Sequence, residues 1–373
     1  MNVLHIIPNL KKGGAERLCL DICKELNFQG HASKIIILNN SNEYLDLYPD
    51  INVVYCPVSF SLSLKRKNSI DLSLIEAVIN KFKPDTIHTH LYEADVLGLA
   101  LDVKNQFCHI HGRLDSYRAL NYLNILKPNK WGLLYEQVWI RKKIRKLKTS
   151  FITIGEDTRN YMLKGIGQYT NNFFSQPNAI DLGRFKINAH AFPASDRPVI
   201  SCLTRLFDYK GVDLIVALAV EFKKENYPIN IKLYGDGPEM NRLKKEVKDN
   251  DISDVLSLEG VCDFPEKELQ KSALFFHPTK QESFGLVLLE AMACGAVCFS
   301  TDGVGNRVLI EDKVNGFFFY HRDPLIIMEK MMEVLANEEL YLEIQQAGLE
   351  FVKAYGIKDY SSNLIKLYRL KLN

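Results

Sequence analysis

The sequence has no hydrophobic run long enough to cross a membrane. Its apolar runs, such as the strand-length stretch at residues 35–38, are far too short, because a membrane-spanning helix needs roughly 20 apolar residues. The first eight residues contain neither a basic stretch nor a small-residue cleavage site, so they do not resemble a signal peptide. These absences predict a cytoplasmic protein, with peripheral binding to the inner face of the cytoplasmic membrane as a further option.

Metal-binding motifs are also missing from the sequence. Its eight cysteines form no CxxC pair and no Cys/His cluster, and we interpret them as buried thiols in a reducing compartment. No Asp-x-Asp pair stands at a predicted strand end where it would face a substrate. We therefore expect no metal ion at the active site and no cofactor.

Charge is nearly balanced overall but divides unevenly along the chain. The net charge is +2, yet residues 1–186 contain 25 basic and 17 acidic side chains, and residues 187–373 contain 22 and 28. The two halves therefore carry +8 and −6. A basic half is typical of a protein that meets an anionic partner such as a lipid surface or a phosphate. We do not expect a nucleic acid as a partner.

Short β-rich runs alternate with helical stretches in both halves, which predicts parallel βαβ units. In the first half, strands are expected at residues 3–7, 34–38, 51–55 and 86–88, and helices at 15–28 and 72–82. In the second half, strands are expected at 199–203, 229–233, 255–258, 273–277 and 296–300, and helices at 212–224, 239–249, 266–271 and 284–294. The pattern predicts an α/β fold of two facing Rossmann-like domains with a cleft between them. Residues 188–197 are the predicted linker.

Two carboxylates, Glu282 and Glu290, lie eight residues apart in an otherwise apolar stretch. With a helix beginning near Phe284, Glu282 precedes the helix and Glu290 sits two turns along it. Eight residues of helix rise about 12 Å, which is roughly the span from a donor sugar across its diphosphate to the ribose. The alternative is that Glu282 caps the helix and Glu290 is solvated, but the apolar neighbours of Glu290 argue against it.

Cations and glycines near other predicted strand ends are further candidates. Arg205 and Lys210 follow the strand at 199–203, where two cations can neutralise a departing diphosphate or simply decorate the surface. The Gly13-Gly14 turn after the first strand is a weak phosphate-binding signal, because an ordinary strand-to-helix turn explains it equally well. His111 can contact a reacting sugar or be a core histidine, and we favour the first interpretation.

Together these motifs resemble the family-4 retaining glycosyltransferases, also described as glycosyl transferases group 1, which have the GT-B fold. The resemblance covers nearly the whole chain. It rests on residues 13–17, the "PD-x-x-H-x-H" stretch at 84–90, residues 177–185, Arg205 with Lys210-Gly211, residues 235–238, and the Glu282/Glu290 pair. Ala179, Ala296 and Val308 depart from it, because the family commonly has Gly, Pro and Glu at these positions.

The resemblance implies a role for each candidate residue. Arg205 and Lys210 would hold the diphosphate, Glu282 the donor sugar and Glu290 the ribose hydroxyls. His111 would lie beside the transferred sugar, and the backbone near Val261 would meet the base. The implied catalytic residues are His111, Arg205, Lys210 and Glu282. The implied donor-binding residues are Gly13, Gly14, Arg205, Lys210, Val261, Glu282, Phe284, Gly285, Leu286 and Glu290.

The resemblance also implies a domain plan. Residues 1–186 would form an acceptor-binding domain, residues 187–354 a domain that binds the nucleotide sugar, and residues 355–373 a helix that crosses back to the first domain.

The implied activity is transfer of a sugar, with retention of anomeric configuration, from a nucleoside diphosphate sugar. A UDP-sugar is the favoured donor. The expected acceptor is a saccharide or a polyprenyl-linked saccharide in bacterial-type surface polysaccharide or glycolipid assembly. Two alternatives are an epimerase or hydrolase acting on nucleotide sugars, and a non-catalytic nucleotide-sugar-binding protein.

Residues 127–148 combine eight basic side chains with a single acidic one, Glu136, and contain both tryptophans of the chain. At helical spacing, Trp131, Leu134 with Tyr135, and Val138 form one stripe. This pattern predicts a helix lying in an anionic lipid interface. The alternative is an ordinary surface helix whose apolar stripe packs on the domain core.

Overall fold

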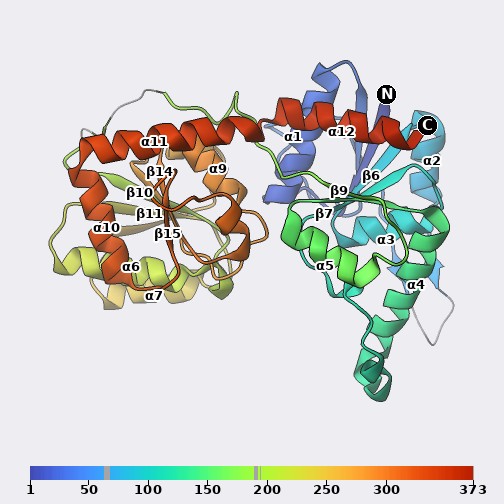
Figure 1. The fold of residues 1–373 in the computed structure, drawn as a ribbon, viewed down its shortest axis with the longest axis horizontal. Coiled ribbons are helices and arrows are strands. Elements are labelled where there is room, and N and C mark those ends of the chain that lie inside the picture. The colour runs from blue at the N-terminus through green and yellow to red at the C-terminus, as the bar shows by residue number, and fades with distance from the viewer. Residues whose placement is uncertain (63–67, 189–191, 194, 373) are drawn as a thin grey trace. The chain divides into compact units, whose positions relative to one another are not determined.

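The computed structural model describes residues 1–62, 68–188, 192–193 and 195–372. The chain forms two compact units: unit 1 comprises Met1–Ala179 and Ile357–Asn373, and unit 2 comprises Ile180–Gly356 (Figure 1). No helix within the described ranges is long and apolar enough to cross a membrane.

Unit 1 is built on a seven-stranded sheet in the order β3-β2-β1-β6-β7-β8-β9. All six strand pairs in it are parallel. The strands are β1 (Asn2–Ile7), β2 (Ala32–Ile37), β3 (Val53–Tyr55), β6 (Thr86–His90), β7 (Gln106–Ile110), β8 (Ser150–Thr153) and β9 (Phe173–Ser175). A separate antiparallel pair is formed by β4 (Phe60–Ser61) and β5 (Ser69–Ile70).

The central strands β1, β6 and β7 are almost entirely buried, as expected for a parallel sheet that is covered by helices on both faces. The α-helices are α1 (Gly14–Phe28), α2 (Ser73–Phe82), α3 (Tyr92–Ala100), α4 (Trp131–Leu147), α5 (Glu156–Ile166) and α12 (Ile357–Leu372). Short 3-10 helices precede α4: η1 (Asp115–Tyr117), η2 (Tyr122–Leu126) and η3 (Pro128–Lys130). The C-terminal helix α12 packs with α1, as the predicted return of residues 355–373 to the first domain requires.

Unit 2 is built on a six-stranded parallel sheet in the order β12-β11-β10-β13-β14-β15. The strands are β10 (Val199–Leu203), β11 (Asn230–Tyr234), β12 (Leu256–Gly260), β13 (Leu274–His277), β14 (Val297–Thr301) and β15 (Phe317–Phe319). Its α-helices are α6 (Val212–Lys224), α7 (Met240–Asp249), α8 (Pro265–Leu269), α9 (Leu286–Ala293), α10 (Pro324–Ala336) and α11 (Glu338–Val352), and its 3-10 helices are η4 (Asp208–Lys210), η5 (Val304–Val308) and η6 (Lys353–Tyr355).

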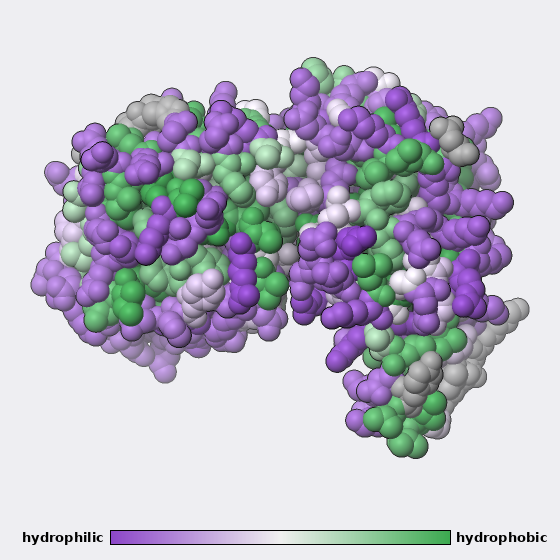
Figure 2. All heavy atoms as spheres, viewed as in Figure 1, coloured by the Kyte–Doolittle hydropathy of each residue, from purple (hydrophilic) through white to green (hydrophobic). Residues whose placement is uncertain are grey.

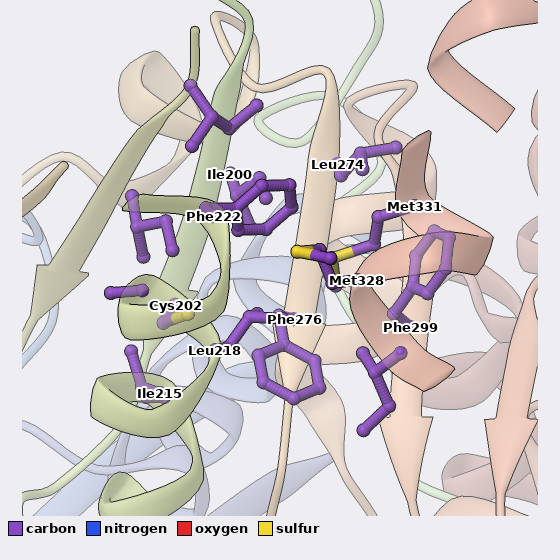
Figure 3. Close-up of a cluster of buried hydrophobic side chains, with 14 of the residues drawn as sticks. Ile200, Cys202, Ile215, Leu218, Phe222, Leu274, Phe276, Phe299, Met328 and Met331 are labelled. Atoms are coloured by element: carbon purple, nitrogen blue, oxygen red, sulfur yellow. The ribbon is translucent and has the colours of Figure 1, made fainter. Parts of the chain in front are cut away.

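One face of this second sheet packs on α6 and α10. Figure 3 shows Phe222 of α6 and Met328 and Met331 of α10 meeting Ile200 and Phe276 from the strands. These five side chains are at most 2% exposed. The predicted α/β fold with two Rossmann-like domains is therefore confirmed.

The division between the units lies seven residues before the predicted boundary at 186/187, and the second division lies at 356/357 instead of 354/355. Residues 180–186 belong to unit 2 because Ile180 donates its backbone N–H to Tyr355 O and Arg184 pairs with Glu266. Within the predicted linker at 188–197, residues 189–191 and 194 lie outside the described residues.

Candidate functional site

Lys210 and Glu282 form an ion pair at the carboxyl edge of the sheet of unit 2. Lys210 ends η4, which follows β10, and Glu282 lies in the loop between β13 and α9. The Lys210 Nζ and Glu282 Oε2 atoms are 2.7 Å apart, and their side chains are only 11% and 16% exposed. His277, the last residue of β13, also reaches Glu282 Oε2, with its Nε2 at 3.1 Å.

These partners fix the charge of Glu282. Burial alone would raise the pKa of its carboxyl group, but the hydrogen bond and charge of His277 and the charge of Lys210 outweigh burial and hold the pKa well below its usual range. The second oxygen, Oε1, accepts the backbone N–H of Ser283 at 3.1 Å. Glu282 is therefore an ionised acceptor held in a fixed position at neutral pH.

A close contact between two loops places Lys210 beside Glu282. Gly211 adopts a positive φ of 73°, and a Cβ atom there would lie 1.8 Å from the Pro278 carbonyl oxygen. The backbone N–H of Lys280 donates to Tyr209 O at 2.9 Å. Any side chain at Gly211 would push the two loops apart and separate the ion pair.

Glu290 lies on α9 and is 1% exposed, so the alternative in which it is solvated is wrong. The helix begins at Leu286, two residues later than predicted, because Gly285 has a left-handed φ of 92° and breaks it. The stretch from Glu282 to Glu290 is therefore not one continuous helix, and the 12 Å helical rise does not describe their separation. Phe284, just before this turn, is buried at 5% exposure.

The loop that contains η5 packs against Glu282. Gly305 donates its backbone N–H to Glu282 O at 2.9 Å. The buried Asn306 side chain donates to Ser300 Oγ at 2.8 Å and to Thr301 O at 3.2 Å. In this way the loop supports the backbone of Glu282, and neither Asn306 nor His277 was predicted to take part.

Arg205 and Val261 are the exposed members of the predicted set in unit 2. Arg205 donates to Tyr209 Oη at 3.3 Å and lies over the Phe207 ring at 5.7 Å. Val261 follows β12 and is 52% exposed. Both belong to loops at the carboxyl ends of β10 and β12, the edge where ligands of such sheets bind.

Gly13, Gly14 and His111 belong to unit 1. The Gly13 backbone donates its N–H to Tyr44 Oη at 3.1 Å, and Gly14 begins α1. The φ of Gly13 is −166°, an extended conformation open to any residue. His111 follows β7, and burial lowers its pKa to about 4, so its imidazole is neutral at pH 7.

His111 is part of a group of five histidines that sequence reasoning missed. His5, His88, His90, His109 and His111 come from β1, β6 and β7 or follow them directly. His5 pairs with His88 in the sheet register, and His90 pairs with His109. The i, i+2 spacing of 88/90 and 109/111 was the available signal, since it places each pair on one face.

Two family models match consecutive parts of this chain. The model described as Glycosyltransferase Family 4 matches residues 12–184, and the model described as Glycosyl transferases group 1 matches residues 184–351. The fold and the two matches define the protein as a glycosyltransferase. The chain belongs to glycosyltransferase family 4, as the sequence motifs indicated.

Individual relatives agree with this assignment. An uncharacterized glycosyltransferase of Haemophilus influenzae is 24% identical over 348 residues, or 93% of each chain. The poly(glycerol-phosphate) alpha-glucosyltransferase of Bacillus subtilis is 24% identical over 251 residues, 66% of this chain and 36% of the relative. The structure of Anabaena Alr3699/HepE in complex with UDP-glucose matches with a TM-score of 0.76 and 16% identity over 98% of each chain.

Proposed function

We propose that this glycosyltransferase moves a sugar from a UDP-sugar to a saccharide acceptor with retention of anomeric configuration. The observation that carries the proposal is the Lys210–Glu282–His277 arrangement at the carboxyl edge of the second sheet, with the buried carboxylate of Glu290 on the adjoining helix. Lys210 and Arg205 supply positive charge for a diphosphate, and Glu282 supplies an acceptor for sugar hydroxyls.

The proposed reaction is a same-face displacement. The bond from the anomeric carbon to the diphosphate oxygen breaks, and the acceptor oxygen forms its bond on the same side of the sugar. The acceptor proton passes to an oxygen of the departing diphosphate. The chain's own contribution is to position both substrates and to stabilise the negative charge of the leaving group through Lys210 and Arg205.

Two relatives support the choice of substrates. The Anabaena protein is in complex with UDP-glucose, which supports a UDP-sugar as the donor here. The Bacillus subtilis relative is a poly(glycerol-phosphate) alpha-glucosyltransferase, which supports an acceptor from surface-polymer assembly. We include polyprenyl-linked saccharides in this acceptor class.

The proposal is tested by calorimetric titration with a panel of nucleoside diphosphates and their sugars, followed by transfer assays with saccharide acceptors. We expect UDP to bind most tightly and the product to keep the anomeric configuration of the donor, as read by NMR. Turnover of the donor without any acceptor would favour the epimerase or hydrolase alternative. Binding without turnover would favour the non-catalytic one.

Variants of the two glutamates separate their roles. Glu290→Gln should weaken UDP binding by about 10- to 100-fold, because a carboxylate that accepts hydroxyl donors contributes on the order of 1.5–3 kcal/mol. Glu282→Ala should abolish most transfer but keep the affinity for free UDP, because it releases Lys210 Nζ for the diphosphate. A large loss of UDP affinity in Glu282→Ala would contradict this division of roles.

We further propose that unit 1 docks on anionic membranes through η2, η3 and the start of α4. Figure 2 shows hydrophobic side chains at the tip of the projection that these elements form in Figure 1. Its exposed apolar residues are Leu123 (66%), Ile125 (54%), Leu126 (79%) and Trp131 (43%). Lys127 and Lys130 are exposed among them, so apolar and basic side chains share one surface, as in interfacial helices.

The structure changes which part of 127–148 is available to lipid. One face of α4 packs on the core of unit 1 through Ile140, Ile144 and Leu147. Arg141 is 2% exposed and lies on this face. The predicted stripe instead has Trp131 and Val138 exposed, at 43% and 51%. Arg141 is therefore removed from the proposed lipid-facing set, and the tip before α4 is added to it.

Co-sedimentation with vesicles tests the docking. Wild type should bind vesicles that contain anionic lipid, more weakly as salt rises, because each lysine near such a surface contributes roughly 1 kcal/mol. Leu126→Asp combined with Lys127→Glu and Lys130→Glu should abolish binding. Lys358→Glu, an exposed change at the start of α12, is the control. Equal partitioning of wild type and the triple variant would overturn this part of the proposal.

A further inference from the structure

Three of the five clustered histidines form a group that reaches the surface of unit 1. One ring nitrogen each from His90, His109 and His111 lies within 4.8 Å of the other two. His90 and His109 are fully buried, whereas His111 is partly exposed, so the group has a path to solvent. The His109 and His111 rings are stacked with their centroids 4.1 Å apart.

His109 is the unusual member of the group. Its side chain is 0% exposed, and both of its ring nitrogens lack a hydrogen-bond partner among the residues that the structure describes. A buried polar atom without a partner destabilises the fold, and such groups in native proteins call for an explanation. A ligand that accepts the lone pair of one His109 nitrogen would remove part of this destabilisation.

The nitrogens of His90 and His111 already have the spacing of metal ligands. His90 Nδ1 and His111 Nε2 are 3.3 Å apart. Two nitrogens on one tetrahedral zinc ion, each at about 2.0–2.1 Å from it, are roughly 3.3 Å apart. The other ring nitrogen of His90, Nε2, lies 3.0 Å from His5 Nδ1. In the tautomer that frees His90 Nδ1 for a metal, His90 Nε2–H donates to His5 and fixes the ring, as outer partners of ligating histidines do.

We propose that His90, His109 and His111 bind one divalent transition-metal ion of the zinc type. The donors are imidazole nitrogens alone, which suit Zn²⁺, Co²⁺ or Ni²⁺ and not Mg²⁺ or Ca²⁺. Neutral imidazole is the form that binds metal. Three protein ligands would leave a fourth position for water or another ligand.

Two deeper groups are weaker candidates. His5 with Cys19 and Cys23, and His5 with His88 and His90, consist of fully buried residues. In the second group, His88 Nδ1 already shares a hydrogen bond of 2.6 Å with Tyr368 Oη. Both groups are competing outcomes of the test: a cysteine ligand gives a distinct spectrum, and a metal held by His5, His88 and His90 would bind independently of His109.

Metal binding would also affect transfer, and this consequence rests on the proposed function. His111 is the residue expected beside the transferred sugar, so an ion held by it occupies the place where the sugar must lie. Zinc should therefore inhibit transfer. The site itself needs no substrate, so metal binding and the proposed function can fail separately.

Titration of the untagged, metal-free full chain with Co²⁺ tests the site directly. We expect one equivalent to bind with the visible bands of nitrogen-ligated cobalt, and Zn²⁺ to displace it. His109→Phe should weaken binding at least about tenfold. This variant should fold, because it removes two buried nitrogens that have no partner in the described structure. His321→Gln, a change at an exposed histidine of unit 2, should bind cobalt as wild type does.

Three outcomes would overturn the proposal: no cobalt spectrum in wild type, equal cobalt affinity of wild type and His109→Phe, or a thiolate-to-cobalt charge-transfer band. The last would assign the metal to Cys19 and Cys23. The activity arm then compares zinc inhibition in wild type and His109→Phe, and we expect inhibition to need at least tenfold more zinc in the variant. Cobalt binding without any transferase activity would leave the metal site standing and reject the proposed function.

Discussion

At the scale of single residues, the ion pair of Lys210 and Glu282 places two opposite charges where little water reaches them. Each charge is costly to bury alone, and the pair is tolerated because each group satisfies the other. The same arrangement keeps a cation and an ionised carboxylate ready at the carboxyl edge of the sheet. A ligand that binds the charge of one residue must therefore also provide a partner for the charge of the other.

Lys210→Met should lower the free energy of unfolding by about 1–3 kcal/mol near pH 7, because it leaves the Glu282 carboxylate with one partner fewer. The native pKa of Glu282 is held below its ordinary value of 4.5. Its ionised form therefore stabilises the fold fully above that value and less as pH falls towards the native pKa. The cost of Lys210→Met should shrink in acid, as measured by calorimetry near pH 7 and near pH 4.

The exposed pair of Lys223 and Asp254 is the matched control for this measurement. Lys223→Met should cost clearly less than Lys210→Met, because solvent screens exposed pairs. If Lys210→Met lowers the free energy of unfolding no more than Lys223→Met does, the Lys210–Glu282 ion pair does not stabilise the fold.

Asp95 provides a second pH-dependent prediction. It is 1% exposed, accepts hydrogen bonds from Thr89 Oγ1 and Tyr117 Oη, and burial raises its pKa to about 7. The native state therefore binds this proton more tightly than the unfolded state, and stability falls as pH rises from about 4 to 7, by up to about 1.4 kcal/mol per pH unit. Asp95→Asn should gain stability relative to wild type over this range, as read by thermal unfolding.

Asp102→Asn is the control for this prediction. Asp102 is an exposed residue whose pKa is lowered by Lys146. Its stability difference from wild type should stay constant between about pH 5 and 8. A constant difference for Asp95→Asn as well would show that Asp95 is ionised throughout.

At the scale of elements, α4 shows what a sequence pattern leaves open. Helical spacing groups side chains into faces but does not say which face meets the core. Here the core-facing side includes a charged residue, Arg141, whose guanidinium donates to the carbonyls of Gln137, Arg118 and Gly165 at 2.9, 2.5 and 3.1 Å. Arg141 therefore holds α4 to the segments on either side of it.

Arg141→Met should destabilise unit 1, because it leaves these buried carbonyls without their donor. A loss of about 3 kcal/mol corresponds to a fall of roughly 6–12 °C in the unfolding midpoint of a unit of this size. Lys142→Met, at the exposed neighbouring position, should leave the midpoint within about one degree. Equal midpoints for the two variants in scanning calorimetry would contradict the structural role of Arg141.

Strong periodic segments were predictable and special backbone turns were not. The strand at 199–203 and the helix at 212–224 match β10 and α6 to the residue, because the β-rich run and the amphipathic run are each clearly bounded and Gly211 directly precedes the helix. The predicted start of α9 was two residues too early, because the sequence does not reveal that the backbone of Gly285 adopts the left-handed conformation.

At the scale of the whole molecule, the second unit's candidate site was largely visible in the sequence. Lys210 and Glu282 are 72 residues apart, but both follow strands of one parallel sheet, and such loops share an edge. His277 and Asn306 were missed because their roles depend on hydrogen bonds to neighbours. The histidine group was missed because it needs the order β1-β6-β7, which no local pattern encodes.

Transferase activity should survive EDTA, because Lys210 and Arg205 are proposed to neutralise the leaving diphosphate without a metal ion. Enzyme carrying zinc on the histidine group should even gain activity in the chelator. Transfer assays with and without EDTA, on protein of known metal content, check both expectations. Full loss of activity in EDTA, restored by Mg²⁺ or Mn²⁺, would refute metal-independent transfer.

The return of α12 to unit 1 has a consequence for synthesis of the chain. Unit 2 begins and ends side by side, with Ile180 bridged to Gly356, so it is an insertion within unit 1. Leu364, Ile365 and Tyr368 of α12 belong to the core that α1 also lines. On the ribosome, unit 2 emerges whole before this core can close. The part of the protein made first is thus completed last, and its apolar surface is what a chaperone would meet while translation is still under way.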